Sequence, residues 1–173
     1  MIQKYLVKVR RNLHQIPELG THLPKTQKYV CEELKKMGIP YWCSEKDSGI
    51  IAEIRGRYEG KTVALRADMD ALPLQEQNAV SYRSRHEGCM HACGHMAILL
   101  GAAKILQEER DGMHGNVRLI FQTAEEISRG SEIAISNGCL KDVAAIFGLH
   151  IGNILGKEIP TGTLIFPRAC CMA

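Results

Sequence analysis

The stretch "TVALRADMD", residues 62–70, joins an apolar, β-branched run to two aspartates. Such a run is typical of a buried strand, and the acids mark its carboxyl end. The segment "GNVRLIFQTAEE", residues 115–126, repeats the arrangement with two glutamates, and "VAAIFGLHI", residues 143–151, closes on a histidine. The sequence therefore predicts three buried strands whose ends carry polar groups.

The segments around these strands have other periods. Apolar spacing and Gly or Pro stop signals predict helices over 3–15, 24–37, 96–109 and 130–140. Ile98, Leu99, Ala102 and Leu106 are predicted to share the buried face of the third helix. Further strands are expected at 41–45, 49–56 and 80–85, with a turn at "YEGK", 58–61, and the start of another strand within 161–173.

Strands that alternate with helices predict an α/β fold, a three-layer arrangement in which helices cover both faces of a mostly parallel sheet. Ligands of such sheets gather beyond the carboxyl ends of the strands. The polar groups at those ends are therefore expected to converge, although they lie far apart in the chain. They are Asp68, Asp70, Glu125, Glu126 and His150.

The composition is that of a globular protein, with 45% apolar and 24% charged residues among 173. A net charge of +3 and 5% aromatic residues give no support for a nucleic-acid partner. The densest basic run, Lys8 to Arg11, is predicted to be a solvated helix face. No apolar run approaches the ~20 residues of a membrane span, and the start of the chain lacks the features of a signal peptide. Seven dispersed cysteines favour a reducing cytoplasm.

The segment "MHACGH", residues 90–95, alternates His91, Cys93 and His95 just before the third helix. Thiolate and imidazole suit zinc and related metals. The plainer interpretation is a buried thiol beside a helix-capping histidine. A third interpretation, a Cys93/His95 thiol hydrolase, leaves the acids at the strand ends without a role.

Glu125 and Glu126 are adjacent, and neighbouring strand residues point to opposite faces, so both can serve one site only from an irregular turn. One carboxylate could then bind metal while the other takes a proton from water. The alternative is a solvated acidic pair that opens the next helix. Asp68 and Asp70 fit a metal site or its support, or a capped turn, and His150 fits a ligand or a structural histidine.

The segments "RRNLHQIPELG", "ALRADMDALPLQE", "MHACGH", "FQTAEE" and "IFGLHI" together resemble the motifs of the M20-type amidohydrolases. Within that family they are similar to the branch of N-acyl-amino-acid, hippurate and auxin-conjugate hydrolases. The resemblance implies a zinc-peptidase-like catalytic domain with two divalent metal ions, zinc or manganese first, with cobalt and nickel also compatible. It implies hydrolysis of the amide bond of an N-acyl amino acid or a related small conjugate.

The resemblance also implies residue roles. Cys93, His95, Glu126 and His150 match metal ligands, and Glu125 matches the general base. Asp68 and Asp70 match an acidic motif that supports the site. The full-length relatives are expected to be homodimers, with a small-molecule substrate and neither a nucleic-acid nor a membrane partner.

The chain departs from the family pattern in two places. The family continues Cys-Gly-His with Asp-x-His, whereas here "CGH" runs directly into "MAILLGAAKIL". His95 therefore matches either the ligand histidine or the later one. In addition, residues 1–173 match only the N-terminal part of the catalytic domain, without the lid and dimerisation domain. We expect negligible hydrolase activity from this chain alone, and the alternative function is a non-catalytic remnant or a partner subunit.

Overall fold

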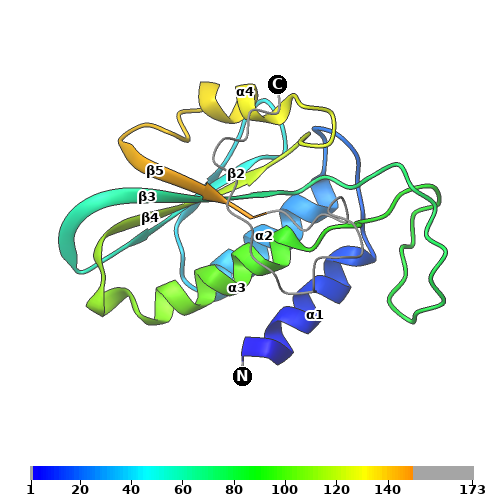
Figure 1. Ribbon diagram of the computed structural model, residues 1–173, viewed down its shortest axis with the longest axis horizontal. Coiled ribbons are helices and arrows are strands. Elements are labelled where there is room, and N and C mark those ends of the chain that lie inside the picture. Colours follow the sequence, from blue (N-terminus) through cyan, green and yellow to red (C-terminus); the bar gives the residue numbers. More distant parts are fainter. Residues whose placement is uncertain (1, 150–173) are drawn as a thin grey trace, which may run out of the picture.

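A five-stranded sheet forms the middle layer of the protein in the computed structural model, which describes residues 2–149 (Figure 1). In spatial order the strands are β1 (Tyr41–Cys43), β2 (Ile50–Arg55), β4 (His114–Gln122), β3 (Tyr58–Asp68) and β5 (Val143–Gly148). The strands β3, β4 and β5 run parallel, whereas β2 is antiparallel to both of its neighbours. The sheet is therefore mixed, and its parallel part contains the three strands that the sequence singled out.

Helices cover both faces of this sheet. The helices α1 (Ile2–His14), α2 (Pro24–Lys36) and α3 (His95–Glu108) lie on one side, and α4 (Gly130–Ser136) lies on the other (Figure 1). A short 3₁₀ turn, Arg110–Gly112, follows α3. The predicted three-layer α/β architecture is confirmed. The sequence placed α1, α2 and α3 to within one residue at each end, but α4 is shorter than predicted.

The main core lies between the sheet and α1, α2 and α3. Its largest buried side chains include Val9, Val30, Leu100, Leu119 and Phe121. The predicted inward face of α3 was wrong at Ile98, which is 38% exposed. The helix instead buries Met96, Ala97, Leu99, Leu100 and Ala103, because both α1 and the sheet pack against it and together cover a wide stripe.

A long irregular segment between β3 and α3 is fastened to α1. The buried His14 Nε2 lies 3.0 Å from Glu76 Oε1, and the other oxygen of Glu76 accepts the Ser84 amide proton at 2.6 Å. The predicted strand at 80–85 is wrong, since the structure has a turn there. The physical reason is that the Glu76 carboxylate takes the Ser84 amide that a neighbouring strand would have paired.

Two other sequence predictions need correction. Residues 58–61 belong to β3 rather than to a turn, and the pairing with β4 shifts register between Tyr58 and Thr62. Gly60 lies so close to Gly115 that a Cβ there would meet its nitrogen at 2.7 Å. Glycine thus lets the strand continue through the irregularity.

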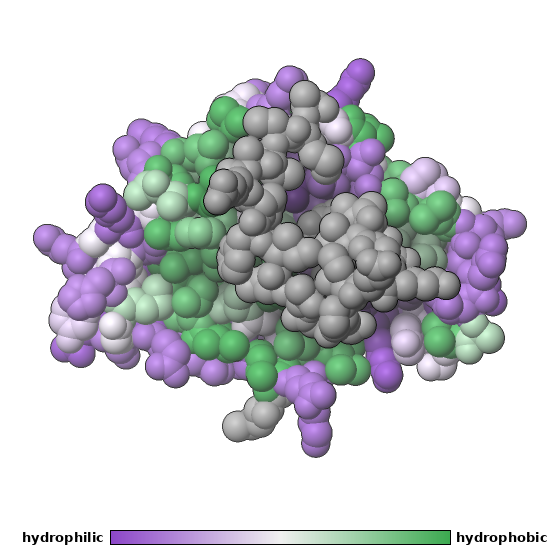
Figure 2. Space-filling view, in the orientation of Figure 1, coloured by the Kyte–Doolittle hydropathy of each residue, from purple (hydrophilic) through white to green (hydrophobic). Residues whose placement is uncertain are grey.

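The strand β5, predicted to be buried, is largely exposed. Among residues 2–149 it pairs with β3 alone, at the edge of the sheet, and Ile146 and Phe147 are 49% and 61% exposed. Hydrophobic residues appear at the surface in Figure 2 in the region that β5 occupies in Figure 1. Within residues 2–149, no helix makes an extensive contact with this strand.

The predicted strand within 161–173 and the candidate ligand His150 lie outside the described residues. Within the described part, every helix is too short or too polar to cross a bilayer.

Candidate metal centre

Three carboxylates converge where β3 and β4 end. In the parallel pairing of these strands, Asp68 lies opposite Gln122, three positions before Glu125. One oxygen each of Asp68, Glu125 and Glu126 lies within 4.8 Å of the others. The sequence predicted this convergence, and its cause is the parallel register, which brings both carboxyl ends to the same edge.

A tight irregular turn lets both glutamates face the site. The strand β4 ends at Gln122, and Ala124 then adopts the left-handed conformation with φ of 51°. Residues 125–128 form the turn, in which the Ser128 amide donates to the Glu125 carbonyl at 2.9 Å. This break in strand geometry removes the alternation that would otherwise send the two carboxylates to opposite faces.

The carboxylate of Asp70 binds the backbone of this turn. Its Oδ1 accepts the Glu125 amide proton at 2.9 Å, and its Oδ2 accepts the Glu126 amide proton at 3.2 Å. The side chain is buried, and burial raises the pKa of Asp70 to about 6, although these two hydrogen bonds act in the opposite direction. Asp70 therefore supports the glutamates without itself belonging to the carboxylate cluster.

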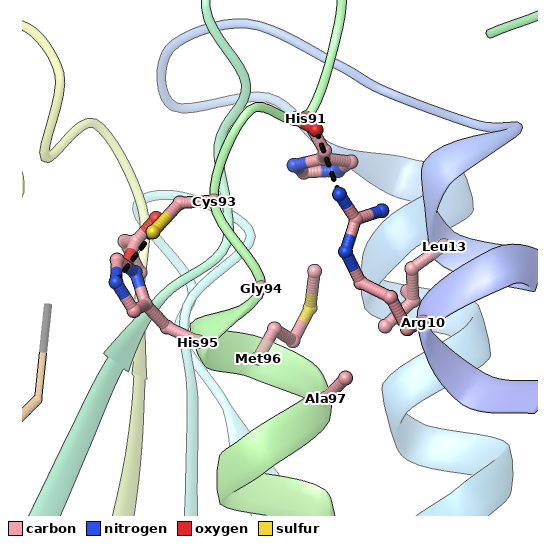
Figure 3. A pocket seen from close by; sticks show the side chains of 9 residues that line it. Arg10, Leu13, His91, Cys93, Gly94, His95, Met96 and Ala97 are labelled. Atoms are coloured by element: carbon pink, nitrogen blue, oxygen red, sulfur yellow. Dashed lines mark hydrogen bonds and ion pairs between the residues drawn. The ribbon is translucent and has the colours of Figure 1, made fainter. Parts of the chain in front are cut away.

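Cys93 and His95 approach Asp68 from the start of α3. The Cys93 Sγ lies 2.5 Å from His95 Nε2 (Figure 3), and His95 Nδ1 pairs with Asp68 Oδ1. Burial opposes a charge on His95, but its hydrogen bonds to Asp68 and Cys93 outweigh burial and raise its pKa to about 9. Burial likewise opposes a charge on Asp68, yet the hydrogen bond from His95 lowers its pKa.

The donor set fits divalent metal ions. Burial and the negative charges of Glu125 and Asp68 raise the pKa of Glu126, because carboxylates this close repel one another. Cations among these oxygens would relieve that repulsion. A thiol and an imidazole next to the same aspartate add the ligands that zinc and similar ions prefer.

The structure thus brings together six of the seven residues that the sequence singled out: Cys93, His95, Asp68, Asp70, Glu125 and Glu126. The seventh, His150, is not among the described residues. Asp68 is more central than expected from a supporting role, because it contacts His95 and also belongs to the carboxylate cluster.

Arg10 is a residue that sequence reasoning missed. The run Lys8 to Arg11 was expected to be solvated, but Arg10 turns inward and its Nη2 donates to the His91 carbonyl at 3.1 Å. The signal was available in the helical period. Arg10 lies three and four residues before Leu13 and His14, which are both buried, and so shares their face.

Gly130 packs so closely against the end of β4 that no side chain fits there. A Cβ at this position would lie 1.5 Å from the Thr123 carbonyl oxygen. We expect Gly130→Ala to displace the end of β4, to cost about 1–3 kcal/mol of stability as overpacking does, and to weaken metal binding. Gly112→Ala is the matched control, since nothing lies within 4 Å of a Cβ there. Equal denaturant midpoints for the two variants would contradict this expectation.

Comparison with known proteins supplies an independent observation. Residues 64–162 match the model of peptidase family M20/M25/M40. The N-acetyl-L-cysteine deacetylase of Bacillus subtilis is 43% identical over 152 residues, and the IAA-amino acid hydrolase ILR1-like 5 of Arabidopsis thaliana is 46% identical over 155. These alignments cover 86% and 88% of this chain.

A solved structure agrees with the fold. The crystal structure of the Bacillus subtilis YXEP protein, described as a dinuclear metal binding peptidase of the M20 family, has a TM-score of 0.82 and 42% identity. It covers 86% of this chain and 43% of that one. The alignments with the two relatives span 36% and 35% of their own lengths, so the chain corresponds to little more than a third of each.

Proposed function

Because this chain belongs to peptidase family M20/M25/M40, we propose that it carries the metal-binding half of an active site that hydrolyses the amide bond of N-acyl amino acids or related small conjugates. Its relatives are amidohydrolases, and one structural neighbour is a dinuclear metal binding peptidase. The observation that carries the proposal is the carboxylate cluster of Asp68, Glu125 and Glu126 beside the Cys93–His95 pair.

Cys93, His95 and Glu126 would hold two divalent ions, together with His150 from the resemblance. Asp68 joins this proposed set because it contacts His95 and lies within the carboxylate cluster. Zinc and manganese suit these donors best, and cobalt and nickel are also compatible. Bound here, the ions would polarise the substrate carbonyl and acidify a water molecule.

Glu125 is the proposed general base. Its carboxylate keeps contact with solvent at the edge of the cluster, and its Oε1 lies 3.8 Å from the guanidinium of Arg66. Arg66 is itself fixed by a 3.0 Å hydrogen bond to Gln122. Glu125 would accept a proton from the attacking water and deliver it to the leaving amine. Asp70, through the two backbone amides, keeps this carboxylate in place.

The proposed substrate class rests on the relatives, whereas the proposed oligomeric state and compartment rest on the sequence and its family resemblance. The deacetylase and the IAA-amino acid hydrolase are named for small amides, which supports a small-molecule N-acyl amino acid as substrate. A homodimeric, cytoplasmic protein without a nucleic-acid or membrane partner completes the proposal. The relatives are longer than the matched region, so the complete hydrolytic activity is itself part of this proposal.

The direct test is the metal content of the purified chain. We expect about two divalent ions per chain by elemental analysis, as a two-metal site requires. Chelation should lower the melting temperature, because ions bound only to the folded state stabilise it. Glu126→Gln should reduce the metal content, whereas Glu108→Gln, an exposed change at the end of α3, should not.

A chain that folds cooperatively but takes up no divalent ion would contradict the proposal. That result would favour the non-catalytic alternative, in which the fold is kept and the chemistry is lost.

A further inference from the structure

The loop that carries Cys93 is attached to α1 by Arg10. Resting on the proposed function, we infer that Arg10 is a positioning residue, which holds this loop so that Cys93 and His95 face Asp68. Figure 3 shows the arrangement: Cys93 and His95 point to one side of the loop, and Arg10 reaches His91 on the other.

Two contacts of Arg10 define the attachment. Its Nη2 donates to the His91 carbonyl at 3.1 Å, across 81 positions of sequence. Its Nε and Cδ lie at 3.4 and 3.5 Å from where a Cβ of Gly94 would be. The side chain is only partly exposed, so its hydrogen bond is shielded from competing water. Arg10 therefore bonds to the loop before Cys93 and lies beside Gly94 after it.

The loop has little else to fix its backbone. Met90 pairs with Leu72 through hydrogen bonds in both directions. Among the described residues, no backbone-to-backbone hydrogen bond involves His91, Ala92 or Cys93, and α3 begins only at His95. The bond from Arg10 thus falls at the start of the span that lacks backbone hydrogen bonds, two residues before Cys93.

His91, whose carbonyl Arg10 binds, also lines the candidate site. Its ring is buried and lines the same pocket as Asp68, Cys93 and His95. The hydrogen bond from Arg10 therefore reaches a residue that lines the site itself. Loss of Arg10 is expected to loosen the thiol and imidazole first, since they lie on the span that it holds.

The test compares Arg10→Met with Arg10→Lys and Arg11→Met. Methionine keeps the apolar stem but cannot donate, whereas lysine keeps a charged donor. Arg11 is a matched control because it is the neighbouring arginine on α1 but is exposed and stacks on Tyr82 at 4.6 Å. The probe is Co²⁺ added to the metal-free full chain, followed through the near-ultraviolet thiolate-to-cobalt absorption that reports the Cys93 ligand.

We expect Arg10→Met to weaken Co²⁺ binding about 10–100-fold, as outer-sphere changes do, and to reduce the thiolate band at saturation. Arg10→Lys should restore part of both, and Arg11→Met should match the wild type. A merely structural role would lower stability without changing the thiolate band of the folded, saturated protein.

Hydrogen exchange of the metal-free chain gives a readout that does not depend on metal. Exchange of the Leu72 and Met90 amides, which pair with each other's residues at the start of this span, should accelerate about tenfold in Arg10→Met, as expected from losing a hydrogen bond with a charged donor beside them, while exchange of 99–105 in α3 stays unchanged. Wild-type exchange in Arg10→Met would overturn the inference. If the wild type itself binds no Co²⁺, the proposed function fails, and exchange alone decides the role of Arg10.

Discussion

Replacing Glu125 with glutamine is expected to lower kcat for an N-acetyl or N-benzoyl amino acid about 10²–10⁴-fold, the usual contribution of a general base. Glutamine keeps the shape of the side chain and its backbone bond to Asp70, but it cannot accept the proton. The measurement is steady-state hydrolysis by the metal-loaded protein that contains these residues, with metal content determined on the same sample.

Glu126→Gln separates the two glutamates, which are neighbours in one turn. We expect this variant to lose metal, whereas Glu125→Gln should keep it, because Glu126 is the proposed ligand and Glu125 is not. If the two variants lost metal equally, Glu125 would be acting as a ligand in the carboxylate cluster of which it is part, and its assignment as the base would be wrong.

The second large effect is expected from Asp70→Asn. An asparagine offers one oxygen in place of two, so either the Glu125 or the Glu126 amide loses its acceptor, and the side-chain NH₂ faces a donor. A buried amide without a partner costs about 1–3 kcal/mol. Because the amide belongs to the turn that carries both glutamates, metal affinity should also fall about 10–100-fold.

Asp111→Asn is the control for this change, since the Asp111 side chain is 81% exposed and has only a loose ion pair with Arg110. Denaturant unfolding of the metal-free variants and a metal titration measure the two effects. If Asp70→Asn had the same unfolding midpoint and metal affinity as Asp111→Asn, the turn would keep its conformation without the Asp70 carboxylate.

Much of the fold followed from local pattern. The helices α1, α2 and α3 were placed correctly because their apolar residues recur at helical spacing over three turns or more. The parallel strands were found because their runs are apolar and end in polar groups. The failures are at places where a distant contact overrides the local signal. Residues 80–85 gave a strand pattern, yet buried Glu76 takes the Ser84 amide.

The sequence predicted which residues form the candidate site, but it did not predict all of their contacts. The order of strand ends predicted that Asp68, Glu125 and Glu126 meet. The spacing of Cys93 and His95 made them candidates, and the family resemblance implied that they are metal ligands. The contact of Asp68 with His95 was not foreseen. It depends on where the start of α3 packs against the end of β3, which no local period encodes.

The sequence by itself determined which chemical groups this protein brings to the edge of its sheet. The reason is that local residue patterns mark strand ends, helix starts and turns. Only the tertiary structure decided how those groups are held. Asp70 binds the amides of a turn 55 positions away, and Arg10 grips a loop 81 positions away. Such contacts arise from packing α1, α3 and the sheet together, and their energy depends on distances that exist only in the folded chain.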